Sequence, residues 1–150
     1  GMTQTHQGYP AAPATDLALG YHEDGTTIFR SWQANLQWTA GPGGLTSTVG
    51  DLERWDQAVR QPGLFTQASL TQMFTPSPLS VSYGAYADGW FISQLDGHRY
   101  VWHDGFLGGF QTMNATFPND GIEIIVLTNT GSGPDPYFII PQLFPIAQSL

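Results

Sequence analysis

Turn signals divide the second half of this chain into short segments that are typical of β-strands. Asp96-Gly97 is a two-residue hairpin signal, and residues 118–121 (Pro-Asn-Asp-Gly) combine a proline that fixes one φ angle with a glycine that permits a positive one. A third, glycine-rich turn falls within residues 105–109. The segments between these turns are rich in aromatic and β-branched residues. Residues 87–129 are therefore predicted to form an antiparallel meander of four strands.

The last strand of this meander is the most apolar. Residues 122–129 are almost continuously hydrophobic, a pattern typical of a buried central strand. If no further strand pairs with this segment, it becomes an apolar sheet edge instead. Such an edge favours pairing with another strand, so we expect the chain to associate, through edge pairing or through burial of its uncovered apolar face.

A β-hairpin and a helix are predicted to precede the meander, after an irregular lead-in over residues 1–16. Asp24-Gly25 is a hairpin turn between two short strands within residues 17–32. A helix is predicted after the next Gly- and Pro-rich loop, because Ser47 or Thr48 can cap its N-terminus and its apolar residues recur every three or four positions. This apolar stripe, which we expect to face the core, comprises Val49, Leu52, Trp55 and Val59.

Two further helical segments complete the chain. Residues 67–74 are predicted to form a short helix capped by Thr66, and residues 137–150 are predicted to form a first turn, a break at the prolines and a short final helix. The order hairpin, helices, meander and terminal helix predicts one α+β domain, with an antiparallel β-sheet flanked by helices. A length of 150 residues agrees with one domain.

Composition excludes several classes of function. The net charge is −8, the four basic residues are all arginines, and lysine is absent. Nucleic-acid binding requires a basic surface, so no nucleic-acid partner is expected. No apolar run is long enough for a membrane span. Cysteine is absent as well, which excludes a thiolate nucleophile and a disulfide framework but fits either redox compartment.

The residues with the most evident chemistry are His103, Asp104 and Gly105, which we expect at the end of a strand. Histidine titrates near neutral pH, and the glycines at 105, 108 and 109 permit close approach of a ligand to the backbone. From chemistry alone, a solvated histidine and aspartate beside turn glycines is the slightly preferred interpretation. A triad of Ser47, His103 and an aspartate can also be assembled, but any serine-containing domain offers such sets.

No metal site is predicted. His98 and His103 lie five residues apart on one strand, so their side chains are expected on opposite faces of the sheet. They are therefore a poor pair of metal ligands.

Several segments, taken in order, resemble the C-terminal part of the serine β-lactamase and penicillin-binding-protein superfamily, in particular the class C β-lactamase-like serine hydrolases and esterases. The resemblance covers nearly the whole chain, and its specificity lies in the ordered set. The segments that carry it are residues 1–5, 17–21, 40–55, 83–84, 89–90, 103–105, 109–110, 118–121 and 126–129. The implied fold is an incomplete β-lactamase or transpeptidase-like fold.

The resemblance also implies roles for the stretch around His103. The family places three motifs around one pocket: S-x-x-K, then Y-x-N or S-x-N, then K-T-G or H-x-G. His103-Asp104-Gly105 resembles the third motif, which implies that His103 orients a substrate carboxylate or assists proton transfer. The backbone N–H of Phe106, directly after Gly105, would be an oxyanion-hole donor. Asp104 departs from the more usual small or hydroxyl residue, which favours an esterase- or peptidase-like relative.

The same resemblance places Asp104, Gly108 and Gly109 at the substrate-binding wall and implies no cofactor. The other two motifs are absent: without lysine S-x-x-K cannot occur, and no asparagine follows a tyrosine or serine by two positions. Residues 1–150 are therefore expected to be one C-terminal region of a longer hydrolase, inactive alone. Its substrate would be a small ester, amide or peptide, its partner the missing N-terminal part or a second copy, and its location periplasmic or secreted. The alternative is a non-catalytic binding or interaction module that kept the fold.

Overall fold

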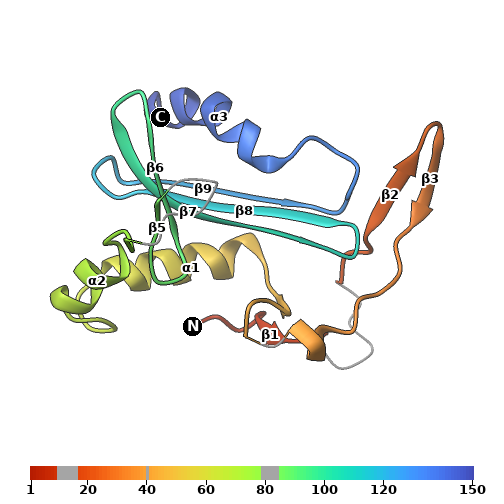
Figure 1. Cartoon of the computed structure of the whole chain (residues 1–150), viewed down its shortest axis with the longest axis horizontal. Coiled ribbons are helices and arrows are strands. Elements are labelled where there is room, and N and C mark those ends of the chain that lie inside the picture. Colours follow the sequence, from red (N-terminus) through yellow and green to blue (C-terminus); the bar gives the residue numbers. More distant parts are fainter. Residues whose placement is uncertain (10–16, 40, 79–84) are drawn as a thin grey trace.

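The computed structural model describes residues 1–9, 17–39, 41–78 and 85–150, and it has an α+β architecture built on an antiparallel sheet (Figure 1). The five strands of this sheet follow one another in the order β5-β6-β7-β8-β9. They are β5 (Ala85–Tyr86), β6 (Phe91–Leu95), β7 (His98–Leu107), β8 (Phe110–Phe117) and β9 (Ile122–Thr128). The predicted meander is thus confirmed, with one additional short strand, β5. Predictions for residues 10–16, for Ala40 and for Tyr83-Gly84 fall outside the described ranges.

Helices lie on both faces of this sheet (Figure 1). One face carries α1 (Val49–Arg60), and the opposite face carries the 3₁₀ helix η2 (Pro136–Ile139) followed by α3 (Ile140–Gln148). The short α2 (Gln67–Met73) follows α1 and begins at the predicted cap, Thr66. No helix in the described ranges is long and apolar enough to cross a membrane.

The hydrophobic core lies between the sheet and α3. Alternate side chains of β7 and β8 point to this face, because successive residues of a strand point to opposite sides. The ring of Phe117, which is 0% exposed, stacks on Tyr100 at 4.9 Å and on Phe144 of α3 at 4.1 Å between ring centroids. The core residues are Tyr100, Trp102, Met113, Ala115, Phe117, Ile124, Ile140 and Phe144.

The buried face of α1 differs from the apolar stripe that the sequence predicts. Thr48 caps the helix by accepting a hydrogen bond from the Asp51 backbone N–H, as expected. Val59 is buried, but Val49 is 48% exposed, and the other buried residues of the helix are Asp51 and Asp56. Helical spacing places Asp56 on the face of Leu52 and Val59, but its partner Asn114 is distant in the sequence. Asp51 lies outside the apolar stripe and is buried against Gln4 and Thr5 of the N-terminal segment.

The first part of the chain forms two small antiparallel pairs. The predicted hairpin is present as β2 (Tyr21–Asp24) and β3 (Thr27–Arg30), and it stands away from the end of the main sheet (Figure 1). The lead-in is not wholly irregular, because β1 (His6–Gln7) pairs with β4 (Leu45–Thr46). A short 3₁₀ helix, η1 (Leu36–Thr39), lies between β3 and β4 in the sequence.

Three boundaries differ from the predictions. The first predicted strand of the meander begins at Phe91 rather than at residue 87. The expected break in the C-terminal segment is absent, because α3 continues through Pro145 after starting with Pro141 in its first turn, where a missing N–H costs little. The last strand, β9, is not central: it is the final strand of the described sheet, and only Ile124 within it is fully buried.

Candidate functional site

His103, Asp104 and Gly105 lie inside a strand, not at its end. The prediction of a strand break at these residues is wrong, because β7 continues to Leu107 and pairs with β8 over its last seven residues. The chain reverses at Gly108-Gly109, where both φ angles are positive (58° and 81°), as a two-residue hairpin turn requires. Gly105 fits within the strand because a Cβ there would meet the Thr112 hydroxyl of β8 at 2.7 Å.

One edge of β7 is open at this position. Strand β6 pairs with β7 only as far as Trp102, so the stretch from His103 to Leu107 has a strand neighbour on its β8 side alone within the described part of the chain. The pairs that close the two flanking hairpins, Leu95 with His98 and Leu107 with Phe110, fix the direction of the backbone groups.

Residues that close a two-residue hairpin exchange hydrogen bonds, and the direction of the backbone groups then alternates along the strand. Both turns give the same result: even-numbered residues of β7 direct their N–H groups away from β8. The N–H groups of Asp104 and Phe106 therefore point to the open edge. The Phe106 side chain itself is 68% exposed.

The imidazole of His103 lies beside this open edge and has two hydrogen-bond partners. Its Nδ1 is 2.7 Å from the backbone carbonyl oxygen of Asp104, and its Nε2 is 3.1 Å from the hydroxyl of Tyr86. The ring also packs near Phe91, with 5.5 Å between centroids. Backbone N–H donors and an imidazole thus lie together at one open strand edge.

The glycines of the turn contact the chain itself. A Cβ at Gly109 would lie 2.2 Å from the Ser31 hydroxyl, and a Cβ at Gly108 would lie 3.4 Å from the backbone oxygen of Trp32. Both glycines therefore allow the turn to pack against the segment that follows the β2–β3 hairpin. A role for Gly108 and Gly109 in substrate binding stays a prediction.

The other histidine of β7 and the candidate serine have different partners. His98 Nδ1 lies 2.7 Å from Asp120 Oδ1, and its ring packs on Phe144 of α3, which agrees with the expected opposite orientation of His98 and His103. Ser47 Oγ lies 2.8 Å from the Thr5 hydroxyl. The hydroxyl that contacts His103 is that of Tyr86, so the Ser47 triad has no support. The described residues contain no group of three potential metal ligands.

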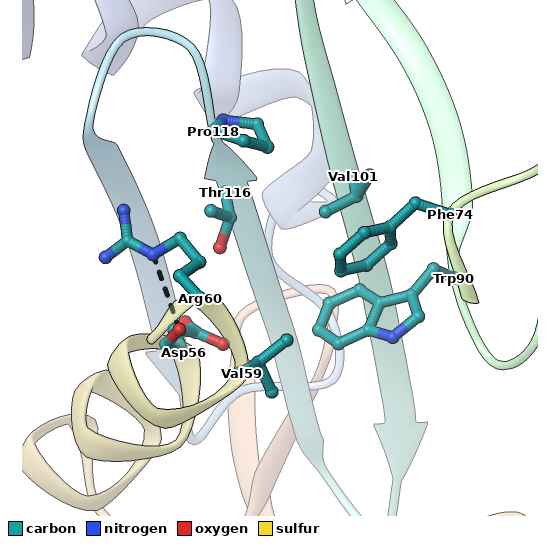
Figure 2. Close-up of a pocket in the computed structure, with 8 residues that line it drawn as sticks. All are labelled: Asp56, Val59, Arg60, Phe74, Trp90, Val101, Thr116 and Pro118. Carbon is teal, nitrogen blue, oxygen red and sulfur yellow. Dashed lines mark hydrogen bonds between the residues drawn. The ribbon is translucent and has the colours of Figure 1, made fainter. Parts of the chain in front are cut away.

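A buried polar cluster lies under the sheet on the α1 side (Figure 2). Asp56 is 2% exposed, and its Oδ1 accepts a hydrogen bond of 2.9 Å from the side-chain amide of Asn114, which stands directly opposite His103 in the β7–β8 register. Burial raises the pKa of Asp56 to about 6, although the Asn114 hydrogen bond and the Arg60 charge oppose this rise. Arg60 also forms an ion pair with Glu123 of β9.

The second buried carboxylate, Asp51, ties the N-terminal segment to α1. It accepts hydrogen bonds from the Gln4 backbone N–H at 2.7 Å, from the Thr5 hydroxyl at 2.8 Å and from Arg54 at 2.8 Å. Burial alone would raise its pKa, but these hydrogen bonds and the Arg54 charge outweigh that effect and lower the pKa of Asp51 below its ordinary value. We therefore assign Asp51 a structural role.

Comparison with known proteins identifies the family. The model of the beta-lactamase family matches residues 1–143 of this chain. The chain belongs to the beta-lactamase family.

This beta-lactamase family member is similar to proteins named as hydrolases and as a penicillin-binding protein homologue. It is 27% identical over 99 residues to an unguisins hydrolase of Aspergillus campestris, an alignment that covers 61% of this chain and 18% of that protein. It resembles the octameric penicillin-binding protein homologue from Pyrococcus abyssi with a TM-score of 0.79 at 21% identity, over 97% of this chain and 34% of the homologue. It resembles a D-stereospecific amidohydrolase from Streptomyces with a TM-score of 0.76 at 18% identity, over 93% of this chain and 43% of the amidohydrolase. The chain thus spans less than half the length of each of these relatives.

Sequence reasoning missed two residues at the site of this beta-lactamase family member. Tyr86 belongs to a two-residue strand after a proline- and serine-rich stretch, and no motif connects it with His103. Asp56 lies on the predicted apolar face of α1, four residues after Leu52 and three before Val59, and its partner Asn114 is 58 residues away in the sequence. Neither contact leaves a local signal, because both depend on how strands and helices pack.

Proposed function

We propose that this chain forms the H-x-G wall of the acyl-transfer site of a β-lactamase-like serine hydrolase that cleaves a small ester, amide or peptide substrate. The observation that carries the proposal is the open edge of β7. There, the N–H groups of Asp104 and Phe106 point away from the sheet, and the imidazole of His103 lies beside them. Membership of the beta-lactamase family supports a serine hydrolase, and relatives named as a hydrolase and an amidohydrolase support an amide or peptide substrate.

Each proposed site residue has one role. Phe106 donates its backbone N–H to the oxyanion of the tetrahedral intermediate. Stabilisation of this oxyanion is usually the largest single contribution to catalysis in such sites. His103 binds a substrate carboxylate or transfers a proton at Nε2, and Gly105 keeps the strand close to β8. Asp104, with a side chain that is 46% exposed, adds a negative charge at the substrate-binding wall. Because Asp104 replaces the usual small or hydroxyl residue of this motif, it favours an ester or peptide substrate over a β-lactam.

The nucleophile of this reaction lies outside these 150 residues. Activation of a serine in this family needs an adjacent base, and S-x-x-K cannot occur in a chain without lysine. Residues 1–150 then act as one C-terminal region, inactive alone. The greater length of the relatives supports this division of the site.

We further propose that the chain pairs with the missing N-terminal part or with a second copy through β9. Its outer edge has no strand partner within the described part of the sheet, and Leu127 of this strand is 38% exposed. A solved homologue that is octameric supports self-association. Sedimentation over a wide range of concentrations should show oligomers, and a monomer at every concentration would contradict association with a second copy.

Hydrolysis of chromogenic substrates tests the proposed function. The purified 150-residue chain and the longest natural protein that contains it are assayed with a short-chain ester, a D-amino acid amide and a cephalosporin. We expect no turnover by the 150-residue chain and turnover of the ester or the amide by the longer protein. In that protein His103→Gln should abolish most of the activity, whereas His98→Gln, on the same strand but the opposite face, should retain it. Turnover by the 150-residue chain alone would refute the divided site.

A further inference from the structure

We propose that Tyr86 is a positioning residue for His103, which it holds in one orientation and one tautomer by donating its hydroxyl hydrogen to Nε2. This inference rests on the proposed function only for its catalytic consequence. Tyr86 has no place in the three motifs discussed above. The proposal comes from the hydrogen bonds and ring contacts around the imidazole.

The hydrogen bonds determine where the proton of the neutral ring resides. The partner of Nδ1 is the backbone carbonyl oxygen of Asp104, at 2.7 Å. A carbonyl oxygen can only accept a hydrogen bond, so Nδ1 must carry the hydrogen. In a neutral imidazole, Nε2 then has a lone pair and no hydrogen. The hydroxyl of Tyr86, 3.1 Å away, consequently donates to Nε2.

Aromatic packing holds both partners in place. Tyr86 and Phe91 are opposite each other in the β5–β6 register, and their rings meet edge to face at 4.7 Å. Phe91 in turn stacks on Trp102 at 4.5 Å and lies 5.5 Å from His103. Because edge-to-face and stacked contacts restrict ring rotation, the Tyr86 hydroxyl stays directed at the imidazole.

A phenol suits this position because it can reverse its hydrogen bond. In the neutral ring the Tyr86 O–H donates to Nε2; in the imidazolium, which has taken a second proton from solvent, Nε2–H donates to the Tyr86 oxygen, and the hydroxyl hydrogen rotates away. No covalent bond to Tyr86 forms or breaks. The ring of His103 thus stays in one orientation before and after a proton transfer. Asp104 contributes to the same orientation through its backbone carbonyl oxygen at 2.7 Å from Nδ1, and its carboxylate lies 3.8 Å from the same nitrogen.

Nitrogen NMR of the 150-residue chain tests this directly and requires no activity. In the wild-type protein, the ¹⁵N shifts should show His103 with a protonated Nδ1 and an unprotonated, hydrogen-bonded Nε2. In Tyr86→Phe, the Nε2 resonance should move towards that of a free ring nitrogen, and a population protonated at Nε2 should appear. His98, which pairs with Asp120, is the internal control and should not change.

Two results would overturn the inference. One is a wild-type His103 that is protonated at Nε2 while Nδ1 is bare. The other is a Tyr86→Phe variant with unchanged His103 shifts. Tyr137→Phe is the matched control. The ring of Tyr137 packs on Trp102 at 4.9 Å between centroids, so this substitution removes a hydroxyl near the same aromatic rings but not the one that contacts His103. Phenylalanine keeps the ring of Tyr86, so the packing with Phe91 and the fold are retained.

Kinetics of the longer protein give the catalytic readout. Tyr86→Phe should lower kcat by roughly three- to tenfold with little change in KM, which corresponds to the loss of one hydrogen bond. The two proposals fail separately. If His103→Gln leaves turnover intact, the proposed function is wrong, but the NMR result stands. If His103→Gln abolishes turnover while Tyr86→Phe affects neither kcat nor the NMR shifts, only the role of Tyr86 is wrong.

Discussion

Replacement of Asp56 by asparagine should stabilise this protein at neutral pH and leave its stability at pH 4 nearly unchanged. Asp56 is buried between α1 and the sheet, next to a small cavity of about 30 Å³ that is lined also by Phe74, Trp90 and Val101 (Figure 2). Its Oδ2 has no hydrogen-bond partner, and the side-chain oxygen of Asn114 has none either. Asparagine at position 56 replaces the unpaired Oδ2 with an NH₂ group, which can donate a hydrogen bond to the unpaired side-chain oxygen of Asn114.

The magnitude follows from the pKa of Asp56. Burial raises this pKa from 3.8 to about 6. At about 1.4 kcal/mol for each pH unit, the charged form costs about 3 kcal/mol of folding free energy. The cost disappears as the pH falls below the ordinary pKa of 3.8, where the carboxyl becomes protonated in both the folded and the unfolded chain. It grows as the pH rises and is complete above the folded pKa of about 6. Arg60 and its ion-pair partner Glu123 are the other charged groups nearby.

Urea denaturation between pH 4 and 8 measures this effect. We expect the wild-type chain to lose stability relative to Asp56→Asn as the pH rises, with a difference of up to about 3 kcal/mol at pH 7.5, or a melting temperature about 6 to 12 °C higher for the variant. Glu53→Gln, the same change of charge on the exposed face of α1, is the control and should show no comparable difference. An Asp56→Asn variant that is less stable than the wild-type chain by the same amount at pH 4 and at pH 7.5 would refute the reasoning.

Three other substitutions test the fold. Phe117→Ala should cost about 3–5 kcal/mol in urea denaturation, because its ring is fully buried between Tyr100 and Phe144; a loss below about 1 kcal/mol would contradict the assigned core. Thr48→Ala should cost about 1 kcal/mol through loss of the helix cap, and an unchanged unfolding midpoint would show that the cap contributes nothing. Asp51→Asn should destabilise the chain at neutral pH, where the carboxylate with its lowered pKa stabilises the fold, and the two proteins should converge as the pH falls below 3.8; a difference that persists in acid would indicate a packing effect instead.

Local chemistry was sufficient to predict most turns and caps. Asp96-Gly97 and residues 118–121 are turns in the structure as predicted, because the required φ angles depend on the residues of the turn themselves. The first hairpin turn is one residue later than predicted, at Gly25 and Thr26, because Asp24 pairs with Thr27 as the last residue of β2. The same holds for the caps at Thr48 and Thr66, where a side chain bonds a backbone group three residues away. Such contacts are within the reach of sequence reasoning.

Strand length near a glycine was not predictable in this way. Gly105 indicated the end of a strand, yet β7 runs through it to Leu107. The pairing with β8 supplies the hydrogen bonds that an isolated segment with a glycine would lack, and the missing Cβ lets Thr112 approach. Tertiary pairing therefore overrode the local preference, and it placed His103 on a regular strand.

The sequence by itself determined the antiparallel meander, because turn residues act locally. It also excluded a Ser–Lys pair within these 150 residues, because they contain no lysine. Only the tertiary structure decided which edge of β7 is open, that the carboxylates of Asp51 and Asp56 are buried, and which nitrogen of His103 carries the proton. The burial of Asp56 and the orientation of the His103 ring depend on groups far apart in the chain. Tyr86 reaches His103 across 17 positions, and Asn114 reaches Asp56 across 58. Such contacts form only when the strands and helices pack, so they leave no periodic or local signal in the sequence.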